Sequence, residues 1–194
     1  GSNSLTELLV AGKRAAQRAA EHAKQAGREN GSAAVSSQAE DVVRGVRELL
    51  LQKGDESLAA VRREMRNALE EGAGIYREES STSATCDKLA DLKERYAAIE
   101  VHDKSNVFNT DLQQALELRN LLDIAETIAE CSLLRRESRG AHQRLDHIER
   151  DDEEFLKHSL AFHRDGNRPR VEWLDVTITR SKPGVRDYSG GKKG

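Results

Sequence analysis

Apolar residues recur every three or four positions over most of the chain, which is the spacing of one face of an α-helix. This periodicity predicts five helices. They are a first helix that starts near Leu5, followed by helices over residues 38–52, 58–71, 84–99 and 109–136. The last is the longest and carries two apolar stripes, so we expect a central helix packed on two sides. The chain is therefore predicted to be mainly α, with a helical bundle as its core.

A polar stretch over residues 28–37 separates the first helix from the rest, and Asn30-Gly31 is its turn signal. This composition predicts a loop. Ser37 and Glu40 have the spacing of a capping box, which places the start of the second helix directly after the loop. We expect a domain boundary within this stretch.

Beyond Gly140, which can end the central helix in a left-handed cap, the pattern changes from helical to alternating. Residues 159–163 and 171–178 alternate apolar with polar or charged side chains, and Asp165-Gly166-Asn167 supplies a turn between them. These segments predict a β-hairpin. Residues 181–194 are polar and glycine-rich, and we expect an extended tail that is ordered only against another surface.

The first helix has features of a helix that belongs to a larger assembly. Ser4 and Glu7 fit a capping box, and after Leu9 the inner face consists of Ala and Gly. Such a face buries too little area to hold a fold by itself. The helix start at Ser4 and Leu5 also offers amide hydrogens to an electron-rich group such as a flavin carbonyl or a phosphate. The capping box alone is a sufficient explanation of the same residues.

Composition disfavours a nucleic-acid-binding protein and a membrane-spanning protein. The 194 residues include 37% apolar and 34% charged side chains with a formal net charge of −3, so we expect a soluble protein without the field needed to hold nucleic acid. No apolar run is long enough to cross a membrane, and the N-terminus lacks the pattern of a signal peptide. Cys86 and Cys131 are isolated, which predicts reduced and buried thiols of an intracellular protein.

Residues 133–162 carry many charged side chains between the central helix and the hairpin. Glu137, Ser138 and His142 include the residue types of a nucleophile and its base, but no oxyanion hole is identifiable, so catalysis is disfavoured. Histidine pairs five residues apart do not fit helical metal ligands, and we expect no metal site. The favoured interpretation is either a set of charge-assisted bonds between the helix end and the tail or a solvated charged face. The residues concerned are Arg135, Arg136, Glu137, Arg139, Arg144, Asp146, Arg150, Asp151 and Asp152.

Several blocks resemble a known family. They are GSNSL (1–5), EEGAGIYR (70–77), SNVFNTDLQQALELRNLLDIAE (105–126), RRESRGAHQRLDHIERDDEEFLKHSLAF (135–162) and VTITR (176–180). In this order they resemble the C-terminal part of the flavoprotein subunit of succinate dehydrogenase and fumarate reductase, over essentially the whole chain. L-aspartate oxidase shares GSNSL and an ESRG-type block but is less similar towards the end, which leaves it as the alternative.

The resemblance implies three regions. Residues 1–31 would be the last helix of an FAD-binding domain whose remainder is absent. Residues 32–137 would be a C-terminal helical bundle with a three-helix, spectrin-repeat-like core. Residues 138–194 would hold a junction, the β-hairpin and the extended tail. The junction residues that the resemblance implies are Arg136, Glu137, Ser138, Arg139 and His142.

By the same resemblance, the full subunit interconverts succinate and fumarate on covalently held FAD. It passes electrons to an iron–sulfur subunit and, through membrane anchor subunits, to a quinone, and nucleic acid is not a partner. The complex would lie on the cytoplasmic side of the bacterial inner membrane, with this subunit peripheral. The backbone amides of Ser4 and Leu5 would face the flavin.

The family's other functional groups precede the blocks found here. These are the glycine-rich dinucleotide motif, the histidine bonded to FAD, the capping domain, and the arginine and histidine groups that bind the dicarboxylate and deliver the proton. We therefore expect no catalytic residue in this chain, and inactivity when it is alone. A hypothesis from another class is a free-standing helical interaction module that uses the exposed stripe of its first helix.

Overall fold

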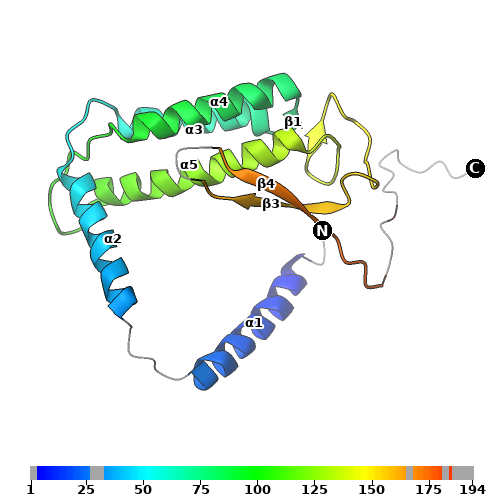
Figure 1. Ribbon diagram of the computed structural model, residues 1–194, viewed down its shortest axis with the longest axis horizontal. Coiled ribbons are helices and arrows are strands. Elements are labelled where there is room, and N and C mark those ends of the chain that lie inside the picture. The colour runs from blue at the N-terminus through cyan, green and yellow to red at the C-terminus, as the bar shows by residue number, and fades with distance from the viewer. Residues whose placement is uncertain (1–3, 27–32, 165–167, 181–183, 185–194) are drawn as a thin grey trace, which may run out of the picture. The chain divides into compact units, whose positions relative to one another are not determined.

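The computed structural model describes residues 4–26, 33–164, 168–180 and 184. Within these ranges the chain forms five helices and four short strands (Figure 1). The chain divides into two compact units, Gly1–Glu48 and Leu49–Gly194.

The first unit contains α1 (Ser4–Ala26) and most of α2 (Ala33–Leu51). The first helix begins one residue before the predicted start. The predicted loop over residues 28–37 is partly wrong, because α2 already begins at Ala33. Two alanines, which have the highest helix propensity, open α2 and place Ser37 inside the helix rather than at its cap. The Asn30-Gly31 turn lies outside the described residues.

The helix α1 buries no apolar face within its own unit. Leu5, Leu8 and Leu9 are between 68% and 76% exposed. The Ala-rich stripe that follows is exposed as well. An amphipathic helix of this length gains most of its stability from packing, so these side chains are free to meet another surface.

The second unit is built on a bundle of three helices that lie side by side (Figure 1). They are α3 (Leu58–Ala73), α4 (Glu79–Tyr96) and α5 (Thr110–Leu134). Ser57 caps α3 by accepting from the amide of Ala60, and Asn109 caps α5 by accepting from the amide of Leu112. The helical fold class predicted from periodicity is confirmed.

The core between these helices comes from the predicted apolar stripes together with Val101, which follows α4 and belonged to no predicted stripe. Its buried members are Val61, Met65, Cys86, Leu89, Leu92, Ile99, Val101, Ala115, Leu118, Leu122, Ala125 and Ala129. Burial, with Glu130 nearby, raises the pKa of the Cys86 thiol to about 12. Cys131 is only half-buried, and both thiols are unpaired.

The predicted start of α4 is wrong by five residues, because the helix begins at Glu79 rather than Ala84. The extra turn contains polar residues that apolar periodicity does not detect. Thr82 is buried and donates its hydroxyl to the carbonyl of Gly72 at 2.6 Å, and Thr85 donates to the carbonyl of Ala68 at 2.9 Å. A side chain at Gly72 would overlap Thr85, so glycine permits this close contact between α3 and α4.

The central helix is packed mainly on one side within the described chain. The first predicted stripe of α5 is buried in the bundle through Ala115, Leu118, Leu122, Ala125 and Ala129, and the second predicted stripe consists of Leu121, Ile124, Ile128 and Cys131. On the second stripe, Ile124 is 57% and Ile128 is 43% exposed. The expectation of packing on two sides is therefore met only in part by the described residues.

Two small sheets follow the bundle. β1 (Tyr76–Arg77) pairs in parallel with β2 (Gln143–Arg144), which the alternation pattern did not reveal. The predicted hairpin is confirmed as β3 (Lys157–Phe162), antiparallel to β4 (Arg170–Asp175).

Parts of the predicted tail remain untested. The hairpin turn at residues 165–167 lies outside the described chain, as does most of the tail. No helix in the described ranges is both long and apolar enough to cross a membrane.

Candidate functional site

The end of α5 is covered by the chain that follows it, and its last carbonyl groups are bound by Arg144. The guanidinium of Arg144 is fully buried and donates to the carbonyls of Ser132 at 3.0 Å and Leu133 at 3.1 Å. It also donates to the carbonyl of Arg135 at 3.3 Å. A helix end leaves such carbonyls without helical partners, so one arginine replaces several missing hydrogen bonds.

The charge of Arg144 is neutralised by Asp146. Two parallel hydrogen bonds of 2.7 Å join the guanidinium to the two carboxylate oxygens. The Arg144 guanidinium holds the pKa of Asp146 far below its ordinary value. Asp146 also accepts from the backbone amide of Glu79 at 2.8 Å, and thereby caps the first turn of α4.

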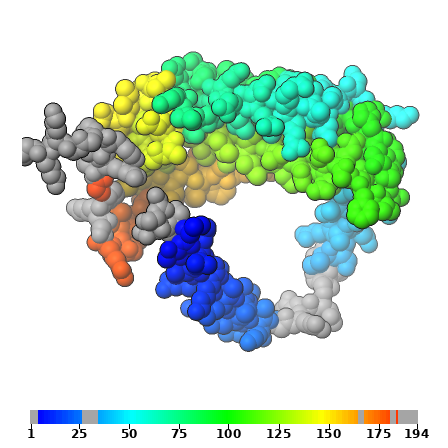
Figure 2. Space-filling model, turned by 180° about the vertical axis from the view of Figure 1, so that it is seen from behind, coloured from blue at the N-terminus to red at the C-terminus, as the bar shows by residue number. Residues whose placement is uncertain are grey.

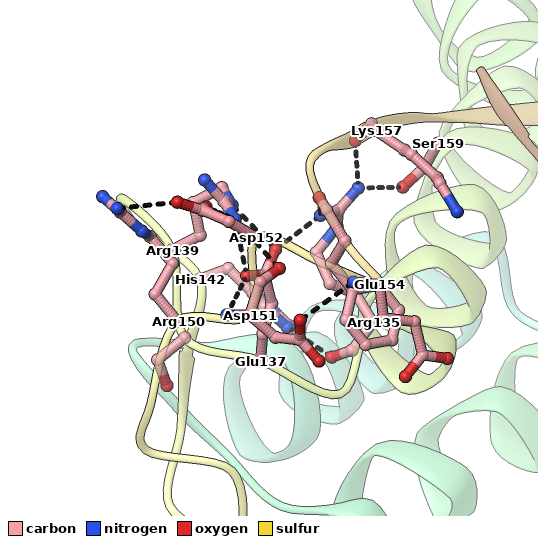
Figure 3. A network of polar contacts seen from close by, with 12 residues as sticks. Arg135, Glu137, Arg139, His142, Arg150, Asp151, Asp152, Glu154, Lys157 and Ser159 are labelled. Carbon is pink, nitrogen blue, oxygen red and sulfur yellow. Dashed lines mark hydrogen bonds and ion pairs between the residues drawn. The ribbon is translucent and has the colours of Figure 1, made fainter. Parts of the chain in front are cut away.

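Glu137 is fully buried between two arginines (Figure 3). Its carboxylate accepts from Arg135 at 2.6 Å, and from Arg139 at 2.8 and 2.9 Å. The backbone amide of Asp151 donates a further bond at 3.0 Å. Burial acts to raise the pKa of Glu137, but the donated bonds, those of Arg139 foremost, outweigh it and hold the pKa below its ordinary value.

Arg135 connects the bundle to the hairpin. Besides Glu137, it donates to the carbonyls of Phe155 at 2.9 Å and Lys157 at 2.6 Å. Its guanidinium also lies 4.9 Å from the ring centre of Trp173, within the range of a cation–π contact. One side chain therefore holds the end of α5 to both strands of the hairpin.

His142 bridges two segments of the junction. Arg77 lies 2.8 Å from the Nδ1 atom of His142 and donates to it, since a guanidinium has no acceptor. The Nε2–H group consequently donates to the carbonyl of Arg135 at 2.9 Å. Burial lowers the pKa of His142 below 6.5, the bond to the Arg135 carbonyl opposes this, and the charges of the nearby arginines add to the lowering.

The Ser138 hydroxyl forms hydrogen bonds with backbone groups and not with His142. Its hydroxyl oxygen accepts from the amide of Arg144 at 2.9 Å and lies 2.8 Å from the carbonyl of His147. The nucleophile–base pair considered from the sequence is not formed. Arg136 is exposed and contributes no hydrogen bond to the network among the described residues.

The described groups nearest to a metal-ligand arrangement are Glu79, Asp146 and His147, whose ligand atoms lie within 4.8 Å of one another. Both oxygens of Asp146 already bind Arg144. The guanidinium therefore occupies the place that a cation would take.

Sequence reasoning missed Arg77 as a member of this site. The residue ends the GIYR block and reaches Ser132 at 2.9 Å and His142 from a position 65 residues upstream of the histidine. No local spacing indicates such a partner.

Ser4 and Leu5, the residues proposed for flavin contact, lie in the first turn of α1, with the Leu5 side chain 76% exposed.

The bundle, junction and hairpin together have the architecture of one region of a larger flavoprotein. The chain is similar to the E. coli quinol fumarate reductase structure with a TM-score of 0.89 and 47% identity, covering 95% of this chain and 32% of that one.

Sequence comparison gives the family. The family described as "Fumarate reductase flavoprotein C-term" matches residues 62–188, and the chain belongs to it. It is 50% identical to the fumarate reductase flavoprotein subunit of Haemophilus influenzae over 188 residues, which are 97% of this chain and 31% of the relative. The E. coli subunit is 47% identical over 192 residues. The chain thus spans about a third of the length of these curated relatives.

Replacing Arg139 with alanine is expected to lower the free energy of unfolding by about 1–3 kcal/mol, because the buried Glu137 loses two of its donors. Urea unfolding of the 194-residue chain measures the change. Arg136→Ala is the matched control, since this arginine is exposed and should change stability by no more than about 0.5 kcal/mol. Equal stability of the two variants would contradict the assigned role of Arg139.

Acidification below pH 6.5 is expected to weaken the junction through His142. Its folded pKa is depressed, so below 6.5 the unfolded chain binds a proton that the folded chain resists, and the free energy of unfolding falls. Above 6.5 this contribution is fully present. Urea unfolding at a series of pH values should show a smaller decline for His142→Gln. The control His158→Gln removes an exposed imidazole and should keep the decline of the parent; identical curves for the two variants would refute the effect.

Proposed function

We propose that this chain acts as the C-terminal part of a flavoprotein subunit that interconverts succinate and fumarate on FAD. The observation that carries the proposal is the 50% identity to a fumarate reductase flavoprotein subunit over 97% of the chain. One solved structure that the chain resembles is a quinol fumarate reductase, which connects this chemistry to a quinol. An iron–sulfur subunit and membrane anchor subunits are the proposed partners, on the cytoplasmic side of the bacterial inner membrane.

The first turn of α1 is the proposed contribution to the flavin site. The helix begins at Ser4, so its first backbone amides have no helical partner, and the adjacent side chains of Leu5, Leu8 and Leu9 are exposed. These features fit an electron-rich, flat group placed against the helix start. When bound, the flavin supplies the redox chemistry, and the amides of Ser4 and Leu5 would orient it by donating hydrogen bonds to a carbonyl.

The remainder of the chain would support the subunit rather than catalyse. Residues 1–31 are assigned to the flavin-binding domain, 32–137 to the helical bundle and 138–194 to the junction and tail. In the polar network around Glu137, Arg135 and Arg139 direct their donors at the backbone, at paired carboxylates and, for Arg135, at the hydroxyl of Ser159. It suits a rigid connection, and no residue of this chain is assigned a catalytic role.

A chimera tests the proposal. In the Haemophilus influenzae subunit, the segment that matches this chain is replaced by residues 1–194. We expect the chimera to retain bound flavin and to reduce fumarate with an artificial electron donor, because this chain is 50% identical to the segment that it replaces. The same subunit truncated before the replaced segment is the control and should do neither.

A chimera that folds but neither holds flavin nor reduces fumarate would contradict the proposal. It would favour the free-standing interaction module instead.

The helix start is tested in the same chimera by Leu5→Pro. Proline is tolerated in the first helical turn but removes the amide hydrogen. A reduced flavin is more electron-rich than an oxidised one, so losing this donor should lower the flavin's reduction potential and shift its absorbance. Thr6→Pro removes the next amide hydrogen of the same turn and should leave the flavin's reduction potential and absorbance unchanged. A Leu5→Pro chimera with the parent's potential and spectrum would exclude the contact.

A further inference from the structure

The hairpin of β3 and β4 is attached to the bundle differently at its two ends. It lies along α5, and its base is near the C-terminal end of that helix (Figure 1 and Figure 2). At the base, Arg135 binds the carbonyls of Phe155 and Lys157, the hydroxyl of Ser159 and the ring of Trp173. Several contacts of one mostly buried side chain therefore fix the base.

The free end of the hairpin, residues 160–162 and 170–172, packs less closely on α5. A cavity of about 380 Å³ lies between this end and the helix, and it is lined by Ile124 and Ile128 on α5 and by Ala161 and Pro169 on the hairpin. Atoms around an unfilled space lose dispersion contacts on one side. Apolar packing therefore holds the free end only in part.

Arg168, two residues before β4, connects the free end to two helices. Its guanidinium lies 3.0 Å from a carboxylate oxygen of Glu130 on α5 and also pairs with Asp87 on α4. The side chain of Glu130 is 8% exposed, whereas that of Asp87 is 73% exposed. An ion pair in contact with water contributes little to stability, so the buried carboxylate is the more important partner.

The two halves of this ion pair differ in burial. Arg168 is 38% exposed, so water can solvate its charge when the hairpin end moves away. The paired oxygen of Glu130 is buried and has no aligned hydrogen-bond donor among the described residues. A buried carboxylate without a counter-charge is costly, so the return of Arg168 is favoured.

We propose that Arg168 and Glu130 form a latch for the free end of the hairpin. When this ion pair opens, the free end detaches from α5, while Arg135 keeps the base attached. Segments with few buried apolar contacts are the ones that open locally in folded proteins. Detachment removes the hairpin side of the cavity and uncovers Ile124 and Ile128. The hairpin is thus a strap that covers and uncovers this face of α5.

Amide hydrogen exchange of the 194-residue chain gives the first test. Glu130→Gln keeps the shape of the side chain but removes its charge. Amides of residues 160–162 and 170–172 should then exchange about tenfold faster or more, because a charge-assisted contact is lost. Amides of residues 157–158 and 174–175, at the base, should keep the exchange rates of the parent.

Asp87→Asn is the matched control, since it removes the exposed partner of Arg168 and should leave exchange at both ends unchanged. Equal acceleration at both ends in Glu130→Gln would show that the hairpin leaves α5 as one unit. No acceleration, or the same acceleration in Asp87→Asn, would show that Glu130 does not hold the free end. Each of these results would overturn the latch.

A double variant gives the second test. Arg168→Gln leaves the Glu130 carboxylate buried without its counter-charge, so the free end should exchange faster than in Glu130→Gln. Adding Glu130→Gln to Arg168→Gln removes that charge and should slow the exchange again. Accelerations that simply multiply in the double variant would overturn the latch. The double variant also serves if Arg168→Gln alone does not fold, because it contains neither charge of the pair.

Discussion

The carbonyl groups at the C-terminal end of α5 are the constraint on which the junction depends. They are covered by the following chain, so water cannot satisfy them, and an unsatisfied buried carbonyl costs free energy. Arg144 satisfies them, but only because Asp146 neutralises its buried charge. Asp146 in turn caps α4 through the amide of Glu79. One helix end thus determines how the second of the three helices begins.

The ion pairs of the junction determine the relative position of α5 and the hairpin more than they raise the free energy of unfolding. A buried ion pair is often no more stabilising than apolar residues of the same volume, because desolvation offsets the attraction. Its bonds are nevertheless directional, and each buried donor or acceptor here has a fixed partner. Arg135 and Glu137 therefore set where the hairpin lies against α5, and the cation–π contact with Trp173 adds to this positioning.

Much of the fold follows from local patterns. The apolar period predicted the three bundle helices and their core, and alternation predicted the hairpin. The start of α4 could not be predicted, because its first amide is bound by Asp146, a residue 67 positions away, and the one buried side chain of its first turn is the polar Thr82. Likewise β1 and β2 have two residues each, too short for any alternation to show. The charged segment predicted the types of interaction in the junction, whereas the choice of partners, Arg77 for His142 above all, depends on tertiary contacts.

The shared carboxylate of Glu137 also makes the effects of replacing the acid and replacing one of its arginine partners unequal. Two guanidinium groups, those of Arg135 and Arg139, share one buried acid. Losing that acid leaves Arg135 without a carboxylate partner within the described residues, whereas Arg139 keeps Asp152. Losing one arginine still leaves the other matched. Replacing Glu137 therefore disturbs the network more than replacing Arg139 does, because only the first change leaves a mostly buried guanidinium, that of Arg135, without its counter-charge.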